Sequence, residues 1–300
     1  MSHRGVYDPM KSPLAPRPIP RSVRSVPPRN TVNPVNANSR SEMSIPEPSK
    51  LSWSYGVTTI PARRHSHLPR TLRSMALAGW DRPRLFVDGV ARGDCGLCKS
   101  YQELGLEITG HYPEMKSGRS TYGNWAMALA ELYARDQECD RYAIFQDDVV
   151  CCLNLRKYLD ACAYPSDGYW NLYTFPVNYR LIRKIQGWGK SNQRGLGALA
   201  LVFNRSTVVK LLSSSTLLEL PVMPVRLKTK GRNNERWRAV DGAVVTAMKN
   251  AGYREYVHNP SLVQHTGIES YLNQARTAHP VADSFKGENF DALRLLARTG

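Results

Sequence analysis

The sequence lacks a long hydrophobic segment. Its longest clear apolar run extends from Leu196 to Phe203, which is far shorter than the ~20 residues that a helix needs to cross a bilayer. The first residues, Met1 to Gly5, lead into prolines and arginines and not into the apolar stretch of a secretory signal. We therefore expect no membrane span and a cytoplasmic protein.

Cysteine is also scarce. Six cysteines in 300 residues do not reach the density of a disulfide scaffold, and adjacent Cys151 and Cys152 are poorly suited to a structural bridge. Cys95 and Cys98 have half the spacing of a zinc site, but no second close pair and no nearby histidine cluster accompanies them. The pattern favours reduced, buried thiols in a reducing compartment.

Acidic residues are outnumbered by basic ones. The chain has 41 Lys and Arg against 25 Asp and Glu, a net charge of +16, and residues 51–300 keep 33 basic against 22 acidic residues. Such a field favours polyanions, which include nucleic acid, an anionic membrane surface and phosphorylated small molecules. Charge that serves only solubility, or that a partner compensates, is the alternative.

The first fifty residues differ from the rest. Residues 1–50 hold ten of the twenty prolines, with Ser, Asn and Arg between them, which predicts a disordered tail. Its basic residues could tether a polyanion, but they also suit a solvated linker. We expect a single folded domain at residues 51–300, without internal repeats.

Strand and helix patterns alternate along this domain. Apolar and β-branched runs predict strands at residues 53–60, 84–88, 107–112, 142–145, 169–175, 195–203 and 253–258. Helical patterns lie at residues 68–77, 123–134, 153–162, 204–212, 240–249 and 293–298. Two basic stretches, residues 178–194 and 226–238, are expected to be long loops. The order predicts an α/β fold with a mostly parallel central sheet flanked by helices.

Two adjacent carboxylates mark the end of one predicted strand. The apolar run from Tyr142 to Phe145 is followed by Gln146, Asp147 and Asp148. Open α/β sheets bind ligands at the carboxyl ends of their strands, so two acids at this place suggest a metal site. A polar strand end without a ligand is the alternative.

Other polar residues stand at neighbouring strand ends. Thr58 and Thr59 close the first strand, and Asp88 closes the second. If these strands are adjacent, one crevice receives all of these side chains. Asp148, with Asp147 or water, would hold Mg²⁺ or Mn²⁺ bridged to a diphosphate, because these hard cations take few protein ligands. His265 could complete the shell or be a structural histidine.

An ordered set of motifs resembles glycosyltransferases of the GT-A fold, a Rossmann-like architecture. The set comprises Val57-Thr-Thr-Ile-Pro-Ala-Arg63, Phe86-Val-Asp88-Gly, Gly123-Asn124, Phe145-Gln-Asp147-Asp148, Asp241-Gly and Val263-Gln-His265-Thr-Gly267. The closing run, residues 259–267, is similar to the branching N-acetylglucosaminyltransferase IV type. The resemblance covers residues 53–270.

The resemblance implies a role for each matched residue. Asp148 takes the place of the metal-binding last acid of the Asp-x-Asp motif, Asp147 the middle position and Gln146 the place of the first acid. His265 would face metal and diphosphate, and Asp241 would be the base of an inverting enzyme. The residues implied to contact the nucleotide sugar are Thr58, Thr59, Arg63, Asp88 and Asn124.

The predicted function follows from these roles. The enzyme would use Mn²⁺ or Mg²⁺ to move a sugar from a nucleoside diphosphate sugar, of UDP type, to an acceptor hydroxyl. The basic loops favour a polyanionic acceptor, either hydroxylated bases in DNA, on which Trp188 or Trp237 could stack, or an anionic envelope glycan or lipid. A non-catalytic nucleic-acid-binding protein on a degenerate transferase domain is the alternative, because Gln146 replaces an acid.

Overall fold

The computed structural model describes residues 51–89, 101, 105–111, 118–219, 226–229, 232–235, 240–266 and 280–298. All of them belong to the compact unit Glu47–Gly300. The tail expected at residues 1–50 and the Cys95 and Cys98 pair lie outside the described residues. Within the described ranges, no helix is both long enough and apolar enough to cross a membrane.

Strands and helices alternate through the described chain, as the sequence pattern predicts. The strands are β1 (Trp53–Thr59), β2 (Arg84–Asp88), β3 (Ile108–His111), β4 (Arg141–Gln146), β5 (Val149–Cys151), β6 (Gly168–Asn171), β7 (Gly187–Lys190), β8 (Ala200–Asn204), β9 (Arg226–Thr229), β10 (Arg232–Glu235), β11 (Arg254–Asn259) and β12 (Val263–His265). The helices are η1 (Pro61–Arg63), α1 (Leu68–Ala78), α3 (Gly118–Arg135), α4 (Leu155–Ala161), α5 (Pro176–Ile182), α6 (Arg205–Leu212), α7 (Ser215–Glu219), α8 (Val240–Asn250) and η2 (Ala292–Arg298).

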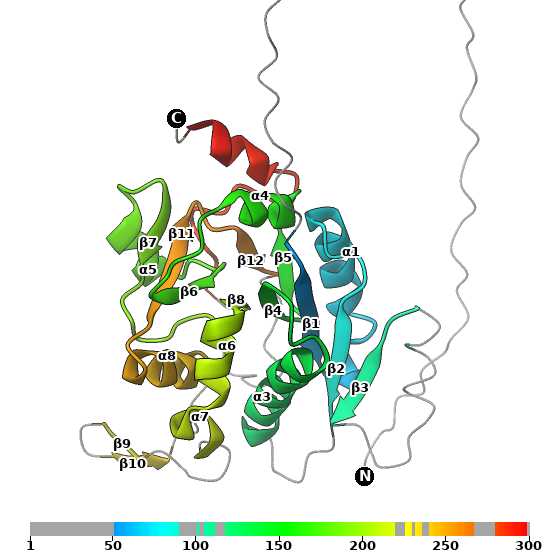
Figure 1. Cartoon of the computed structure of the whole chain (residues 1–300), viewed down its shortest axis with the longest axis vertical. Coiled ribbons are helices and arrows are strands. Elements are labelled where there is room, and N and C mark those ends of the chain that lie inside the picture. Colours follow the sequence, from blue (N-terminus) through cyan, green and yellow to red (C-terminus); the bar gives the residue numbers. More distant parts are fainter. Residues whose placement is uncertain are drawn as a thin grey trace, which may run out of the picture. The chain divides into compact units, whose positions relative to one another are not determined.

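The central sheet has eight strands in the order β3-β2-β1-β4-β8-β6-β11-β7 (Figure 1). β1 pairs in parallel with β2 and β4, β2 with β3, and β6 with β11. β8 runs antiparallel to β4 and β6, and β7 runs antiparallel to β11. The predicted mostly parallel sheet is therefore confirmed.

The middle of the sheet is buried on both faces because strands such as β4 and β8 are largely apolar. In β4, Ala143 and Phe145 point into one core, and Tyr142 and Ile144 point into the other. The first core also receives α1 and α4, and the second receives α3, α6 and α8. Complete burial of a side chain such as Phe145 contributes roughly 1.5–3 kcal/mol, so helices on both faces are what this sequence requires.

A small second sheet lies beyond the end of β4. β5 begins directly after Asp148 and pairs antiparallel with β12, with His265 opposite Val149. The N–H of Thr266 also donates to the carbonyl of Asp148 (2.8 Å). This pairing brings residues more than a hundred positions apart to one strand end.

Four expected elements differ from the structure. Residues 195–199 do not continue β8, because Gly195 and Gly197 adopt positive φ angles of 67° and 78°, which interrupt an extended strand. The basic stretches at residues 178–194 and 226–238 are not only loops, since they contain α5 with β7, and β9 with β10. The terminal helix is a 3₁₀ helix, η2.

Candidate functional site

Asp147 lies at the carboxyl end of β4, where β1 and α1 meet it. Its side chain accepts a hydrogen bond from Thr59 Oγ1 (2.6 Å) and one from Arg63 Nη1 (2.5 Å). Its carbonyl accepts from Thr71 Oγ1 (2.8 Å). The register places Thr58 opposite Gln146, so the end of β1 and the following turn η1 supply both side-chain donors.

Asp148 lies beside Asp147 and has different partners. Its Oδ2 accepts from Arg63 Nη1 (2.8 Å) and lies 3.2 Å from His265 Nε2. Its Oδ1 is buried and makes no hydrogen bond within the described part of the chain. Both carboxylates are about 3% exposed, and a buried carboxylate oxygen without a partner is costly unless a cation or ligand satisfies it.

The two carboxylates, which we call the acid pair, carry different proton affinities. Burial alone would raise the pKa of Asp148, but the hydrogen bond and charge of His265, together with Arg63, lower it to about 2. Burial raises the pKa of Asp147, and the neighbouring charge of Asp148 adds to this effect while Arg63 and Thr59 oppose it. Asp148 is therefore the member that holds its negative charge most firmly.

The donor atoms of the site fit a hard divalent cation with few protein ligands. Asp148 offers the unpartnered Oδ1, and His265 Nε2 is adjacent to the same carboxylate. Mg²⁺ and Mn²⁺ complete such a shell with water and phosphate oxygens. The described residues contain no group of three His, Cys, Asp or Glu side chains arranged for a metal, and Asp147 is turned to Thr59 and Arg63. The chemistry fits a two-residue shell.

His67 is a site residue that the sequence analysis missed. It lies at the start of α1, its N–H donates to the carbonyl of Arg63 (3.2 Å), and its Nδ1 is 2.8 Å from Ser66 Oγ. Its Nε2 is buried without a hydrogen-bond partner among the described residues. Burial and the charge of Arg63 lower its pKa, and the charge of Asp148 only partly opposes them. The ring thus adds a polar atom beside the acid pair. In the sequence, only its position four residues after Arg63 could have indicated this.

Gln146 connects the acid pair to Asp241. Its side-chain Nε2 donates to the carbonyl of Ala198 (2.9 Å), and its N–H donates to the carbonyl of Leu199 (2.8 Å). In the same turn, the N–H of Gly197 donates to Asp241 Oδ2 (3.0 Å). Asp241 therefore lies at the edge of the sheet that carries the acid pair, and Gln146 has a structural use at the position where an Asp-x-Asp motif has its first acid.

Asp241 is held by backbone groups at the start of α8. Besides Gly197, the N–H of Gly242 donates to Oδ1 (2.9 Å). A Cβ atom added to Gly195 would lie 2.3 Å from the carbonyl oxygen of Asp241, so glycine permits the close approach. Burial raises the pKa of Asp241, and the backbone hydrogen bonds partly offset this.

The remaining predicted contacts to the nucleotide are bonded within the protein. Thr58 Oγ1 donates to the carbonyl of Phe145 (3.3 Å). Asn124 is buried, donates to the carbonyl of Phe86 (3.1 Å) and lies 2.5 Å from His111 Nδ1 through its Oδ1. Asp88 is 5% exposed at the end of β2. The structure thus brings together Thr59, Arg63, the acid pair and His265, whereas Asn124 joins α3 to β2 and β3.

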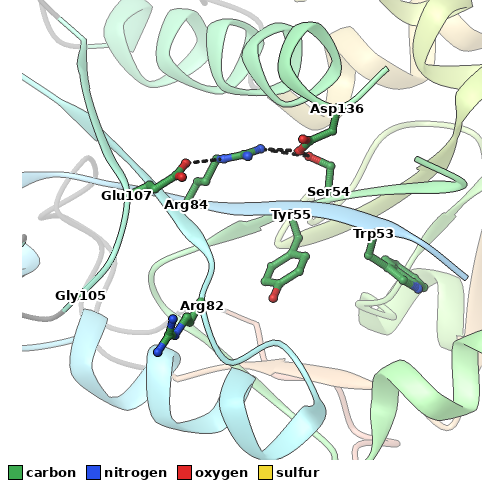
Figure 2. A pocket seen from close by; sticks show the side chains of 8 residues that line it. All are labelled: Trp53, Ser54, Tyr55, Arg82, Arg84, Gly105, Glu107 and Asp136. Carbon is green, nitrogen blue, oxygen red and sulfur yellow. Dashed lines mark hydrogen bonds and ion pairs between the residues drawn. The ribbon is translucent and has the colours of Figure 1, made fainter. Parts of the chain in front are cut away.

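A separate cavity of ≈ 270 Å³ lies at the other end of the strands, near the beginnings of β1 and β2 (Figure 2). Arg84 occupies its wall and is paired with Glu107 (2.8 Å) and Asp136 (2.5 Å). Trp53 and Tyr55 line it from β1. Because α/β sheets bind ligands at the carboxyl ends of their strands, we assign the candidate site to the acid pair and not to this cavity.

Comparison with known proteins gives fold-level likenesses. No family model matches the chain, and no curated protein matches its sequence. The mannosyltransferase PcManGT from Pyrobaculum calidifontis, solved with GDP-Man and Mn²⁺, is 12% identical over 70% of this chain and 55% of its own, with a TM-score of 0.42. TarS from S. aureus is 12% identical over 69% and 35%, with a TM-score of 0.41.

A third solved structure is GalNAc-T7 with UDP, GalNAc and Mn²⁺. It is 12% identical over 72% of this chain and 43% of its own, with a TM-score of 0.43. This chain spans between 35% and 55% of the length of these three proteins. Likeness at this level leaves the function to be argued from the residues of the site.

Proposed function

We propose that this chain is a metal-dependent glycosyltransferase that moves a sugar from a nucleoside diphosphate sugar to an acceptor hydroxyl. One observation carries the proposal. Asp148, a buried carboxylate with an unpartnered oxygen, lies beside His265 at one end of the strands, and the same end holds Asp241, a second carboxylate bound by backbone N–H groups. Cation binding and proton removal, the two tasks of such a transfer, would then lie side by side.

Asp148 and His265 would hold Mn²⁺ or Mg²⁺, which when bound neutralises charge on the departing diphosphate. Arg63 would supply a second positive group, because its guanidinium already lies between the two acids. Thr59 and Arg63 fix the orientation of Asp147, which supports the neighbouring ligand. His67 offers one more polar atom to a phosphate oxygen.

Asp241 is the proposed base. Two backbone N–H groups orient its carboxylate, and burial raises its pKa. A raised pKa makes a carboxylate a better proton acceptor, provided that it is still ionised at the working pH. It would take the proton of the acceptor hydroxyl as that oxygen attacks the sugar carbon, while the bond to the diphosphate breaks.

The donor proposed is a UDP-sugar, of hexosyl or N-acetylhexosaminyl type, as the resemblance to the N-acetylglucosaminyltransferase IV type implies. The acceptor proposed is polyanionic, either hydroxylated bases in DNA or an anionic envelope glycan, because the chain is strongly basic. Trp188 does not favour stacking on bases. Its ring stacks on Trp170 in the core, with centroids 4.6 Å apart.

Turnover of a donor panel tests the proposal. Wild-type protein is incubated with nucleotide sugars and Mn²⁺, and release of nucleoside diphosphate is followed, since many transferases slowly hydrolyse their donor without an acceptor. We expect release from at least one donor, loss of release with EDTA, and a decrease of about 10²-fold or more in Asp148→Asn. Metal-independent release, or no release and no binding from any donor, would favour a degenerate, non-catalytic domain.

A further inference from the structure

Helix α5 and the turn after it expose large apolar side chains. Val177, Leu181 and Ile185 are 37%, 58% and 45% exposed. Val177 and Leu181 are four residues apart and share a face of the helix. Ile185 follows directly, with its N–H bonded to the carbonyl of Ile182 (2.8 Å). Grouped apolar side chains on a surface mark interaction sites more often than isolated ones do.

The segment that follows Pro176 also exposes several cations. Its exposed cationic side chains are Arg180, Arg183, Lys184, Lys190 and Arg194. The chain has no Asp or Glu from Gly168 through Leu218, so this segment supplies no local acid to neutralise them. We call these five cations, together with Val177, Leu181 and Ile185, the α5 surface. It combines an apolar stripe with a positive field.

The α5 surface is fixed to the sheet. β7 is the last strand of the eight-stranded sheet, next to α5 in Figure 1. A Cβ atom added to Gly189 in β7 would lie 2.7 Å from Ile182 Cγ2, so α5 packs closely on that strand. Asn259 in β11 also donates through Nδ2 to the carbonyl of Ile185 (2.8 Å). The exposed side chains therefore project from a supported base.

We propose that the α5 surface docks on an anionic lipid bilayer. Cations beside an anionic bilayer are attracted to its headgroups, and aliphatic side chains among them gain by entering the headgroup and acyl boundary. A nucleic acid would use the cations but gives aliphatic side chains no apolar layer, and Trp188 is already stacked in the core. The mixture of exposed aliphatic and cationic groups thus favours lipid.

Docking would also bring the bilayer near Asp241. Phe175 precedes α5, and a Cβ atom added to Gly197, whose N–H holds Asp241, would lie 3.6 Å from Phe175 Cδ2. An acceptor at a membrane surface would then reach the carboxylate that we propose as the base. The docking itself does not depend on the proposed transferase activity, and its test uses binding alone.

Vesicle sedimentation of the full chain tests the docking. The vesicles contain phosphatidylcholine alone, or phosphatidylcholine with about one-third phosphatidylglycerol. We expect binding to the anionic vesicles only. Each removed cation costs about fivefold in partitioning, so Arg183→Gln with Lys184→Gln should weaken binding about 25-fold. Lys157→Gln with Lys210→Gln, two exposed cations on other helices, is the matched control.

A second pair of variants tests the apolar stripe. Leu181→Ser with Ile185→Ser should weaken vesicle binding about tenfold, whereas Leu77→Ser with Met127→Ser, which are 56% and 54% exposed elsewhere, should not. Thermal melting of each variant checks that it is folded. No binding to anionic vesicles, or binding insensitive to the Leu181 and Ile185 changes, would overturn the proposal. So would duplex DNA binding that depends on the cations in the absence of vesicle binding.

Discussion

Gln146 is the residue whose replacement tests the link between the acid pair and Asp241. Gln146→Met keeps the length of the side chain but removes the donor to the carbonyl of Ala198 (2.9 Å). The N–H of Gln146 still bonds to Leu199, so β4 stays in register with β8. The perturbation is confined to one hydrogen bond at the turn that holds Asp241.

The size of the expected destabilisation follows from the burial of the Ala198 carbonyl. Ala198 is 5% exposed, and a buried carbonyl that loses its donor costs about 1–3 kcal/mol. A loss of about 2 kcal/mol would lower the Tm of a domain of this size by roughly 4–8 °C. The loss of stability within residues 195–199 should be larger than that of the whole domain. Gly197, whose N–H binds Asp241, directly precedes the Ala198 carbonyl that loses its donor.

Hydrogen exchange measures that local effect. We expect the amides of residues 195–199 to exchange faster in Gln146→Met, together with weaker donor turnover. Tyr142→Phe is the matched control, since it removes a hydrogen bond from the other end of the same strand, Tyr142 Oη to the carbonyl of Asp136 (2.6 Å). Unchanged exchange at residues 195–199 in Gln146→Met, or the same increase in both variants, would refute the link.

Three further outcomes are expected. Burial lowers the pKa of the His258 ring to about 4. The neutral ring therefore stabilises the fold above about pH 6.5, and up to about 3 kcal/mol of that stability is lost as the pH falls toward 4. The free energy of unfolding in urea should depend less on pH in His258→Gln than in wild type, and equal slopes would contradict this. Gly195→Ala should destabilise the fold more than Gly187→Ala. Both glycines have positive φ, but only a Cβ atom at Gly195 would meet the carbonyl of Asp241. Equal melting temperatures for the two variants would count against the close approach. Arg63→Met removes the guanidinium that lies between the two acids, a loss of about 3–5 kcal/mol. Mn²⁺ should therefore raise the melting temperature of the variant more than that of wild type. An equal rise would contradict a cation site there.

The sequence predicts the fold where hydrophobic patterning is strong. β2 is predicted with its observed bounds, Arg84–Asp88, because an apolar run ends there at an Asp-Gly turn. α6 begins at Arg205, one residue after the predicted start, and Asn204 and Thr207 form a capping box there. In such segments local chemistry and burial agree.

Prediction fails where tertiary contacts decide the local conformation. β7 is polar and rich in glycine, and it becomes a strand because β11 offers an edge and Gly189 allows α5 to pack on it. Residues 195–199 look like strand but turn away, because Gly195 and Gly197 take positive φ beside Asp241. These contacts join segments distant in sequence, which a local pattern does not record.

The candidate site is predicted in part for the same reason. Strand-end acids and the order of motifs point to the acid pair, Arg63 and His265, which the structure brings together. The polar contacts of Asn124 inside the protein, and the unpartnered Nε2 of His67, depend on how helices pack on the sheet. The partners of a polar side chain are set by that packing.

Calorimetric titration with nucleoside diphosphates in the presence of Mn²⁺ tests the central claim most directly. The titration compares wild-type protein with Asp148→Asn, which keeps the shape of the side chain and removes the charge beside His265. We expect that at least one nucleoside diphosphate binds wild-type protein, only with the metal present, and that this binding is lost in Asp148→Asn. Binding that is absent throughout, or that survives both EDTA and Asp148→Asn, would contradict it.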